Sequence, residues 1–182
     1  MSAELLRDAE TRMKKSLEAA ANDFATLRTG RANAAILDSV KVEYYGQPMT
    51  IASVAAVSVP ESRTLLIAPW EKNMLGPIEK AILKSDLGLN PNNDGQNIRL
   101  NIPPLTEQRR KEFVKQLAGK AESARVALRN LRRDTMEQYK KDDTNTEDDI
   151  KRAEKDVQKL LDKYIAELET MYKAKEAELL EV

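Results

Sequence analysis

Apolar residues recur with the spacing of amphipathic helices in two flanks of this 182-residue chain, on either side of a central segment with a different pattern. In the first flank an apolar residue returns every seven positions, at Leu6, Met13, Ala20 and Leu27. Leu17 and Phe24 lie between them and complete one apolar stripe. The first flank is therefore predicted to be a helix that ends near Gly30.

The second flank predicts two further helices. Thr106 is placed to cap the first of them, and its apolar spacing continues from Val114 to Tyr139. The polar stretch 142–145 interrupts the pattern, and Thr146 then opens a capping box followed by acids that suit a helix N-terminus. Each of these helices has about 35 residues, which corresponds to roughly 50 Å at a rise of 1.5 Å per residue.

Apolar stripes of this length must be covered by other apolar surface, and the stripes of the three predicted helices can cover one another. The short loop at 142–145 makes the last two helices antiparallel. All seven prolines and five of the six glycines lie between Gly30 and Pro104, which leaves both flanks almost free of helix breakers. We therefore expect an elongated three-helix bundle built from residues 1–29 and 106–182.

The central segment, residues 30–105, has the shorter period of β-strands. Strands are predicted at 40–45, 54–59, 65–68 and 98–102, the middle two being more continuously apolar than the others, as buried strands are. Tyr45-Gly46-Gln47-Pro48 is typical of a turn, and one helix fits between Pro77 and Gly88. The expected fold class is α+β, with a small β/α/β domain inserted into the helical bundle.

An inserted domain is joined to its host by two neighbouring crossings of the chain. They are predicted at Thr29, Gly30, Arg31 and Ala32 and at Pro103, Pro104, Leu105 and Thr106. The glycine crossing is flexible and the proline crossing is stiff, so that the two form a hinge about which the small domain swings. The alternative is that both crossings pack tightly and fix the angle.

Aromatic residues of the central segment are expected to pack and not to stack on bases. Consecutive strand residues face opposite sides of a sheet, so one of Tyr44 and Tyr45 is predicted to lie in the core and the other at the surface. A packing role is expected for Trp70 as well.

Composition excludes several classes of function. The chain has no His and no Cys, which removes the usual proton shuttle, thiol nucleophiles, disulfides and the N/S ligands of zinc or iron–sulfur sites. It has no phosphate-binding loop, dinucleotide-binding glycine motif or nucleophile elbow. The acid pairs at 142–143 and 148–149 lie in a loop and a helix cap, where acids are expected without a metal. We expect no enzyme, no catalytic residues, no metal and no cofactor.

Two observations bear on location. No uninterrupted apolar run approaches the roughly 20 residues of a membrane span. The first seven residues do not have the basic and then apolar pattern of a signal sequence. Together with the absence of cysteine, these features favour a cytoplasmic protein without a membrane partner.

The formal net charge is zero, from 30 basic and 30 acidic residues, but the charge is unevenly distributed. Residues 106–141 hold 11 basic and 5 acidic residues, a net charge of +6. Residues 142–182 hold 7 basic and 13 acidic residues, a net charge of −6. The neutral total conceals a basic helix followed by an acidic one.

Arginines are grouped on the basic helix. Arg125, Arg129 and Arg132 have the spacing i, i+4, i+7 and share a face, with Arg133 beside them. This face is predicted to lie about 100° from the apolar stripe and to point to solvent. Arginine suits phosphate because its planar fork donates two parallel hydrogen bonds. Charge alone leaves two interpretations open, nucleic-acid binding and a solvated face paired with acids of the last helix.

Several motifs, in order along the whole chain, resemble those of the bacterial ribosome recycling factor family. They are Leu27–Ala32, Val42–Gly46, Ser85–Pro91, Pro103–Lys111, Ala124–Asp134, Val157–Leu160 and Lys175–Leu179. At Asn33-Ala34 the chain departs from the family, which usually has a proline there, and this affects only the stiffness of that crossing.

The resemblance implies a monomeric factor that binds the ribosome after termination and, with elongation factor G and GTP, splits it into subunits, the hydrolysis belonging to elongation factor G. It implies that large-subunit ribosomal RNA is bound through Arg28, Arg31, Arg110, Arg129, Arg132 and Arg133. The small domain and the hinge would receive the push from elongation factor G. The acidic last helix is expected to face away from RNA or toward a basic ribosomal protein.

Two other classes of function are compatible with parts of the sequence. A coiled-coil-like structural or chaperone protein would use the apolar stripes for partners and would be oligomeric. A metal-dependent hydrolase would use the paired acids and would lose activity on chelation.

Overall fold

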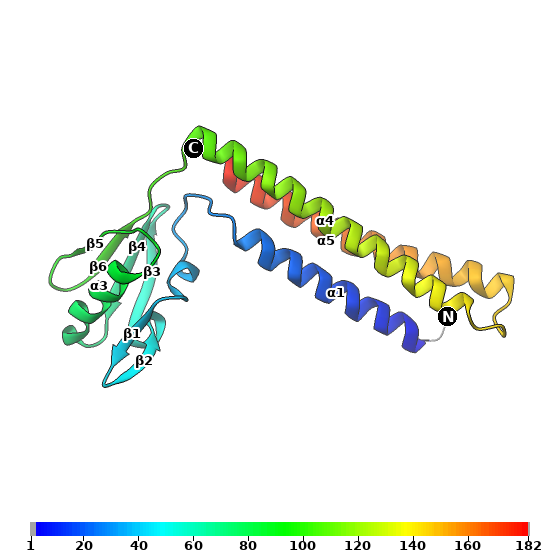
Figure 1. The fold of residues 1–182 in the computed structure, drawn as a ribbon, viewed down its shortest axis with the longest axis horizontal. Helices are drawn as coiled ribbons and strands as arrows, with labels where there is room; N and C mark the ends of the chain where they lie inside the picture. Colours follow the sequence, from blue (N-terminus) through cyan, green and yellow to red (C-terminus); the bar gives the residue numbers. More distant parts are fainter. Residues whose placement is uncertain (1–2, 182) are drawn as a thin grey trace. The chain divides into compact units, whose positions relative to one another are not determined.

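The chain folds into two compact units (Figure 1), and the computed structural model describes residues 3–181. The first unit comprises the flanking stretches up to Thr29 and from Thr106 onward. The second unit is Gly30–Leu105. Within the described residues, no helix is long and apolar enough to cross a membrane.

The first unit is a bundle of three helices, α1 (Ala3–Ala25), α4 (Glu107–Lys140) and α5 (Glu147–Leu180). Both long helices have 34 residues, close to the length predicted from the apolar spacing. The predicted caps are present, since the Thr106 hydroxyl accepts a hydrogen bond from the N–H of Arg109, and Thr146 and Asp149 form a reciprocal capping box. Local sequence signals therefore determine where both helices begin.

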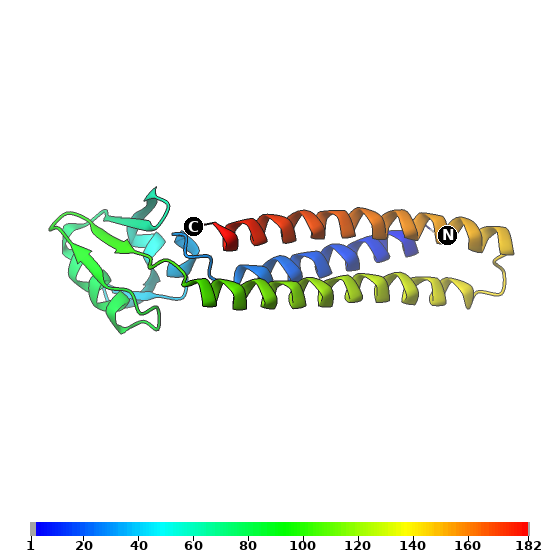
Figure 2. The same cartoon turned by 90° about the horizontal axis from the view of Figure 1, so that it is seen from above.

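The three helices lie side by side (Figures 1 and 2). Helices α4 and α5 are antiparallel, because Arg125 pairs with Glu169 whereas the later Lys140 pairs with the earlier Glu154. The interior holds apolar side chains that are almost fully buried, namely Met13, Leu117, Leu128, Val157, Leu168 and Leu179. Met13, Leu117 and Leu128 belong to the stripes that the sequence predicted for the first two helices.

Helix α1 is fastened to both long helices by ion pairs at the bundle surface. Asp23 accepts from the Lys120 ammonium of α4 at 2.6 Å. Glu10 accepts from Lys163 of α5 at 3.1 Å and from the Tyr164 hydroxyl at 3.3 Å. These donors lower the pKa of Glu10, the hydrogen bond from Lys163 being the largest cause.

The second unit contains a four-stranded antiparallel sheet of order β3-β4-β6-β5 and a separate hairpin. The sheet strands are β3 (Ala55–Glu61), β4 (Thr64–Pro69), β5 (Pro91–Asn93) and β6 (Ile98–Asn101). The hairpin pairs β1 (Lys41–Tyr44) with β2 (Gln47–Thr50). The helices are α2 (Ile51–Val54), α3 (Leu75–Lys84) and two short 3-10 turns, Ala34–Leu37 and Lys72–Met74.

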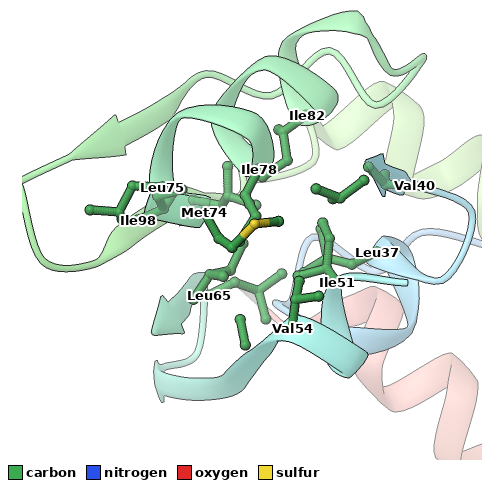
Figure 3. Packing of buried hydrophobic residues seen from close by; sticks show 14 of the residues in the cluster. Leu37, Val40, Ile51, Val54, Leu65, Met74, Leu75, Ile78, Ile82 and Ile98 are labelled. Carbon is green, nitrogen blue, oxygen red and sulfur yellow. The ribbon is translucent and has the colours of Figure 1, made fainter. Parts of the chain in front are cut away.

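The core of this unit lies between α3, the sheet and the β1–β2 hairpin (Figure 3). Ile78 and Ile82 of α3 are buried against Leu65 and Ile98, which come from the two central strands β4 and β6. Ile51, at the start of α2, is buried in the same hydrophobic cluster. The unit therefore has its own hydrophobic core, as an inserted domain requires.

The structure differs from the predicted central segment in several ways, among them the unpredicted short strand β5. Residues 54–59 were expected as a buried strand, but β3 is an edge strand, and most of its side chains are exposed, including Val59 at 46%. Gln47 and Pro48 were expected in a turn but begin β2, because the turn is made by Tyr45 and Gly46, which both have positive φ. An apolar run indicates a strand, but it does not say whether the strand has two neighbours or one.

The aromatic residues follow the predictions in part. Tyr44 packs against the core and Tyr45 is 76% exposed, as expected for consecutive strand positions. The packing role predicted for Trp70 is wrong, because its side chain is 68% exposed. Trp70 follows the last residue of β4, where the chain leaves the sheet.

Candidate nucleic-acid interface

Helix α4 carries five of the arginines singled out in the sequence, and two of them are largely exposed to solvent. Arg129 and Arg133 are 59% and 63% exposed. Their acidic neighbours lie on the same helix, Glu122 at 3.6 Å from Arg129 and Asp134 at 3.5 Å from Arg133. Exposed pairs at such distances contribute little free energy. Both guanidinium groups therefore remain available to an anion on a partner.

Arg125 is an exception to the predicted solvent-exposed face. Its side chain is 20% exposed, its Nε donates to Glu169 of α5, and its Nη1 donates to Glu122 at 3.0 Å. Its guanidinium also lies 5.5 Å from the ring centroid of Tyr172. The hydrogen bond with Glu169 is the main cause of a raised pKa of Arg125 and a lowered pKa of Glu169. The prediction of solvent exposure is wrong here because this face borders α5.

Arg110 and Arg132 are less exposed than Arg129 and Arg133. Both are half-buried, and their Nε atoms are buried without a hydrogen-bond partner. Neither makes an ion pair within 4 Å in the part of the chain that the structure describes. Long basic side chains bury their stems and keep the charge near the surface. These two charges are not neutralised at close range from within the bundle.

The other two predicted RNA-binding residues belong to different units. Arg28 is exposed, follows α1 and belongs to the bundle with the α4 arginines. Arg31 is exposed and belongs to the second unit. Five of the six predicted arginines therefore lie in one compact unit.

Both predicted crossings are attached to the same part of the second unit. The N–H groups of Ala32 and Ile102 donate at 2.8 and 2.7 Å to the carbonyl groups of residues 62–63, in the β3–β4 turn. Gly30 has φ +78°, and a Cβ there would lie 3.3 Å from the backbone nitrogen of Leu105. A glycine is required at this position, both for the left-handed backbone and for the close approach.

Three basic residues of α5 were not predicted from the sequence to be functional. Lys151, Lys155 and Lys159 line a groove between α4 and α5 together with Arg132. Their regular spacing of four residues was the available signal. The net acidic charge of residues 142–182 concealed it.

One acid of each pair near the α4–α5 loop has a structural partner. Asp142 accepts hydrogen bonds from the hydroxyl and the N–H of Thr144, and Asp149 accepts from the same groups of Thr146. These bonds lower the pKa of both carboxyl groups. Among residues 3–181, no cluster of three or more His, Cys, Asp or Glu is placed to hold a metal ion. The acids thus form a turn and a helix cap.

Comparison with known proteins gives consistent matches over nearly the whole chain. A family model described as "Ribosome recycling factor" matches residues 20–180. The chain is 56% identical over 183 residues to the ribosome-recycling factor of Caldicellulosiruptor bescii, covering 99% of this chain and 100% of the relative. It is 52% identical to that of Nitratidesulfovibrio vulgaris, covering 98% of this chain and 97% of the relative.

Solved structures agree with these matches. The solution structure of a ribosome recycling factor is similar with a TM-score of 0.79 and 43% identity, covering 98% of this chain and 97% of that one. A second similar chain comes from a structure of the T. thermophilus ribosome recycling factor and E. coli elongation factor G bound to the E. coli post-termination complex. Its TM-score is 0.66 at 46% identity, with 98% of both chains covered.

Proposed function

The chain belongs to the ribosome recycling factor family, and from this premise we propose that it binds the post-termination ribosome in the cytoplasm and, with elongation factor G and GTP, splits it into subunits. The match to ribosome recycling factors along the whole chain is the observation that carries this proposal. The elongated bundle with its solvent-facing arginines supports it. The alternative of a chaperone that uses the apolar stripes is not favoured, because those stripes are buried within the bundle.

In the proposed function the bundle binds the phosphates of large-subunit ribosomal RNA. Arg129 and Arg133 are exposed and only weakly paired, and within the described part of the chain Arg132 and Arg110 have no ion pair within 4 Å. Arg28 adds a further exposed charge to the same unit. Phosphate contacts of this kind position a protein on RNA without reading its sequence.

The second unit and the crossings have a mechanical role in this proposal. Hydrolysis of GTP belongs to elongation factor G, and this chain contributes no catalytic step. The attachments of Ala32 and Ile102 to the β3–β4 turn support a hinge confined to residues 29–31 and 103–106, between these attachments and the bundle. Such a hinge lets the small domain move while the arginines stay on the RNA. Arg31 is a residue of this hinge that belongs to the second unit, and it is proposed to contact RNA from the hinge.

Binding to purified large subunits in a salt series tests the RNA contact. Replacing Arg129→Ala together with Arg132→Ala removes two proposed phosphate contacts. The slope of log affinity against log salt should fall by about 0.9 for each lost contact with a duplex. The matched control is Arg63→Ala with Arg99→Ala, two exposed arginines of the second unit. Equal slopes for the two double variants would refute an RNA contact through the α4 arginines.

Sedimentation of post-termination ribosomes tests the function itself. Free subunits should accumulate when the chain, elongation factor G and GTP are all present, and not when any one of them is omitted. Free subunits in the absence of this chain, or none in its presence, would contradict the proposal.

A further inference from the structure

The N-terminal half of α5 carries a row of lysines that differs from the rest of this acidic helix. Lys151, Lys155 and Lys159 are separated by four residues each and therefore lie on one face of α5, about 6 Å apart along its axis. All three side chains are exposed. The α5 helix is thus acidic in sum but basic along this face.

These lysines line an open groove between α4 and α5 with a volume of about 540 Å³. The groove is also lined by Arg132, Glu154, Gln158 and Asp162. Its lining therefore contains four basic and two acidic residues. Both acidic residues have internal partners, since Glu154 accepts from Lys140 at 2.9 Å and Asp162 accepts from Gln158 at 2.8 Å. The Lys140 hydrogen bond is the main cause of the lowered pKa of Glu154.

The basic residues of the groove, by contrast, form no ion pair within 4 Å among residues 3–181, and Glu154 lies near enough to Arg132 only for a weaker electrostatic attraction. Within residues 3–181, none of the three lysines forms a hydrogen bond or an ion pair within 4 Å. Among the residues that the structure describes, Arg132 has no ion pair within 4 Å, and its buried Nε has no acceptor. The bundle holds four positive charges around this groove and leaves them without an anion at hydrogen-bonding distance.

We propose that this groove binds the phosphate backbone of RNA, so that the RNA-binding surface continues from Arg129, Arg132 and Arg133 of α4 onto Lys151, Lys155 and Lys159 of α5. This inference rests on the proposed function but adds a second helix to its RNA contact. It differs from the expectation that the acidic last helix faces away from RNA. Arg132 connects the two sets of residues, because it belongs to the arginines of α4 and also lines the groove with the lysines of α5.

The composition of the groove favours RNA over an acidic protein. Protein interfaces depend on aromatic or aliphatic anchors buried at their centre. No lining residue of this groove is apolar. A row of evenly spaced ammonium groups on a rigid helix instead suits a chain of repeated phosphates, because lysine binds each phosphate as a point charge.

The test compares two variants that change the charge equally. Lys155→Glu reverses the middle charge of the groove, and Lys15→Glu reverses an exposed lysine of α1. Affinity of the full chain for purified large subunits is measured from about 50 to 200 mM salt. Lys155→Glu should lower the slope by about 0.9 and the affinity at about 50 mM salt by at least threefold, whereas Lys15→Glu should match the wild type. Lys155→Arg, which keeps the positive charge, should bind large subunits with the wild-type affinity and slope.

The outcomes separate this inference from the proposed function. If Arg129→Ala with Arg132→Ala lowers the slope but Lys155→Glu leaves affinity and slope unchanged, the groove does not bind RNA and the proposed function stands. If affinity falls with an unchanged slope, the groove contacts something other than phosphate and the inference is wrong. If the wild-type chain does not bind large subunits at all, both proposals fail. Circular dichroism melting shows whether each variant is folded before binding is measured.

Discussion

Arginines of one helix have different roles in this protein because of what lies beside each of them. Arg125 faces α5 and is held by Glu169, Glu122 and the ring of Tyr172. Arg129, four residues later, is 59% exposed and has one ion-pair partner, Glu122 at 3.6 Å on its own helix. The first is part of the bundle's packing, and the second is available to a ligand.

Substitutions of Arg125 and Arg129 should have different effects on the free energy of unfolding. Arg125→Met should lower the free energy of unfolding by about 1–3 kcal/mol, because it removes charged hydrogen bonds and leaves the carboxylate of Glu169 unpaired. Arg129→Met should change it by less than about 0.5 kcal/mol, as exposed positions generally do. Urea unfolding followed by circular dichroism measures both. Equal losses of stability would mean that Arg125 is not a structural residue.

Alanine substitutions of two glycines, Gly30 and Gly119, should have opposite effects on the stability of the fold. Gly30→Ala should destabilise the fold by about 1–2 kcal/mol, since the residue has φ +78° and its Cβ would approach the Leu105 nitrogen to 3.3 Å. Gly119→Ala should stabilise it by about 0.5–1 kcal/mol, because Gly119 lies within α4 and its Cβ would meet nothing within 4 Å. Thermal or urea unfolding of both variants is the measurement. Stabilisation by Gly30→Ala would show that the crossing does not require a left-handed residue.

The sequence was informative about residue types but less so about their partners. Grouped arginines, the caps at Thr106 and Thr146 and the glycine at position 30 are all visible in local patterns. The partner of Arg125 is 44 residues away along the chain, and no local pattern reveals it. The same is true of the Ala32 and Ile102 attachments, which depend on how the β3–β4 turn folds back.

At the scale of elements, the helices were easier to predict than the strands. The long helices depend on hydrogen bonds and caps between residues close in sequence, so their spacing and ends were predicted closely. Strands depend on distant partners. The short strands β2 and β5 were therefore missed, and β3 was expected to be buried when it is an edge strand.

Ion pairs that join the helices should make the bundle sensitive to acid. The pKa of Glu169 is lowered mainly by Arg125, that of Glu154 by Lys140 and that of Glu10 by Lys163. A carboxyl whose pKa is lower in the folded state contributes stability above its unfolded pKa, and this contribution is lost as the pH falls through the folded pKa.

The urea midpoint should therefore be constant from about pH 7 to 5 and should fall below about pH 4, where the carboxyl groups take up protons. The Arg125→Met variant should show a shallower acid dependence, because Glu169 then titrates nearer its ordinary pKa. Parallel pH profiles for the two proteins would show that this pair does not contribute to the acid dependence.

At the scale of the whole molecule, a neutral chain presents separate charged surfaces. The basic and acidic halves of the second flank, with net charges of +6 and −6, pack against each other as α4 and α5. Part of the charge is cancelled inside the bundle, as at Arg125 and Glu169. The remaining arginines and the lysines of the α4–α5 groove lie on its surface. These are the residues that we propose to bind ribosomal RNA.

The most direct test of this account is the yield of free subunits from post-termination ribosomes, measured by sedimentation as the chain is titrated with fixed elongation factor G and GTP. The wild type should split the ribosomes. Arg129→Ala with Arg132→Ala should need a higher concentration but reach the same maximal yield, because only binding is weakened. Splitting by the variant at the wild-type concentration, or no splitting by the wild type at any concentration, would contradict the account.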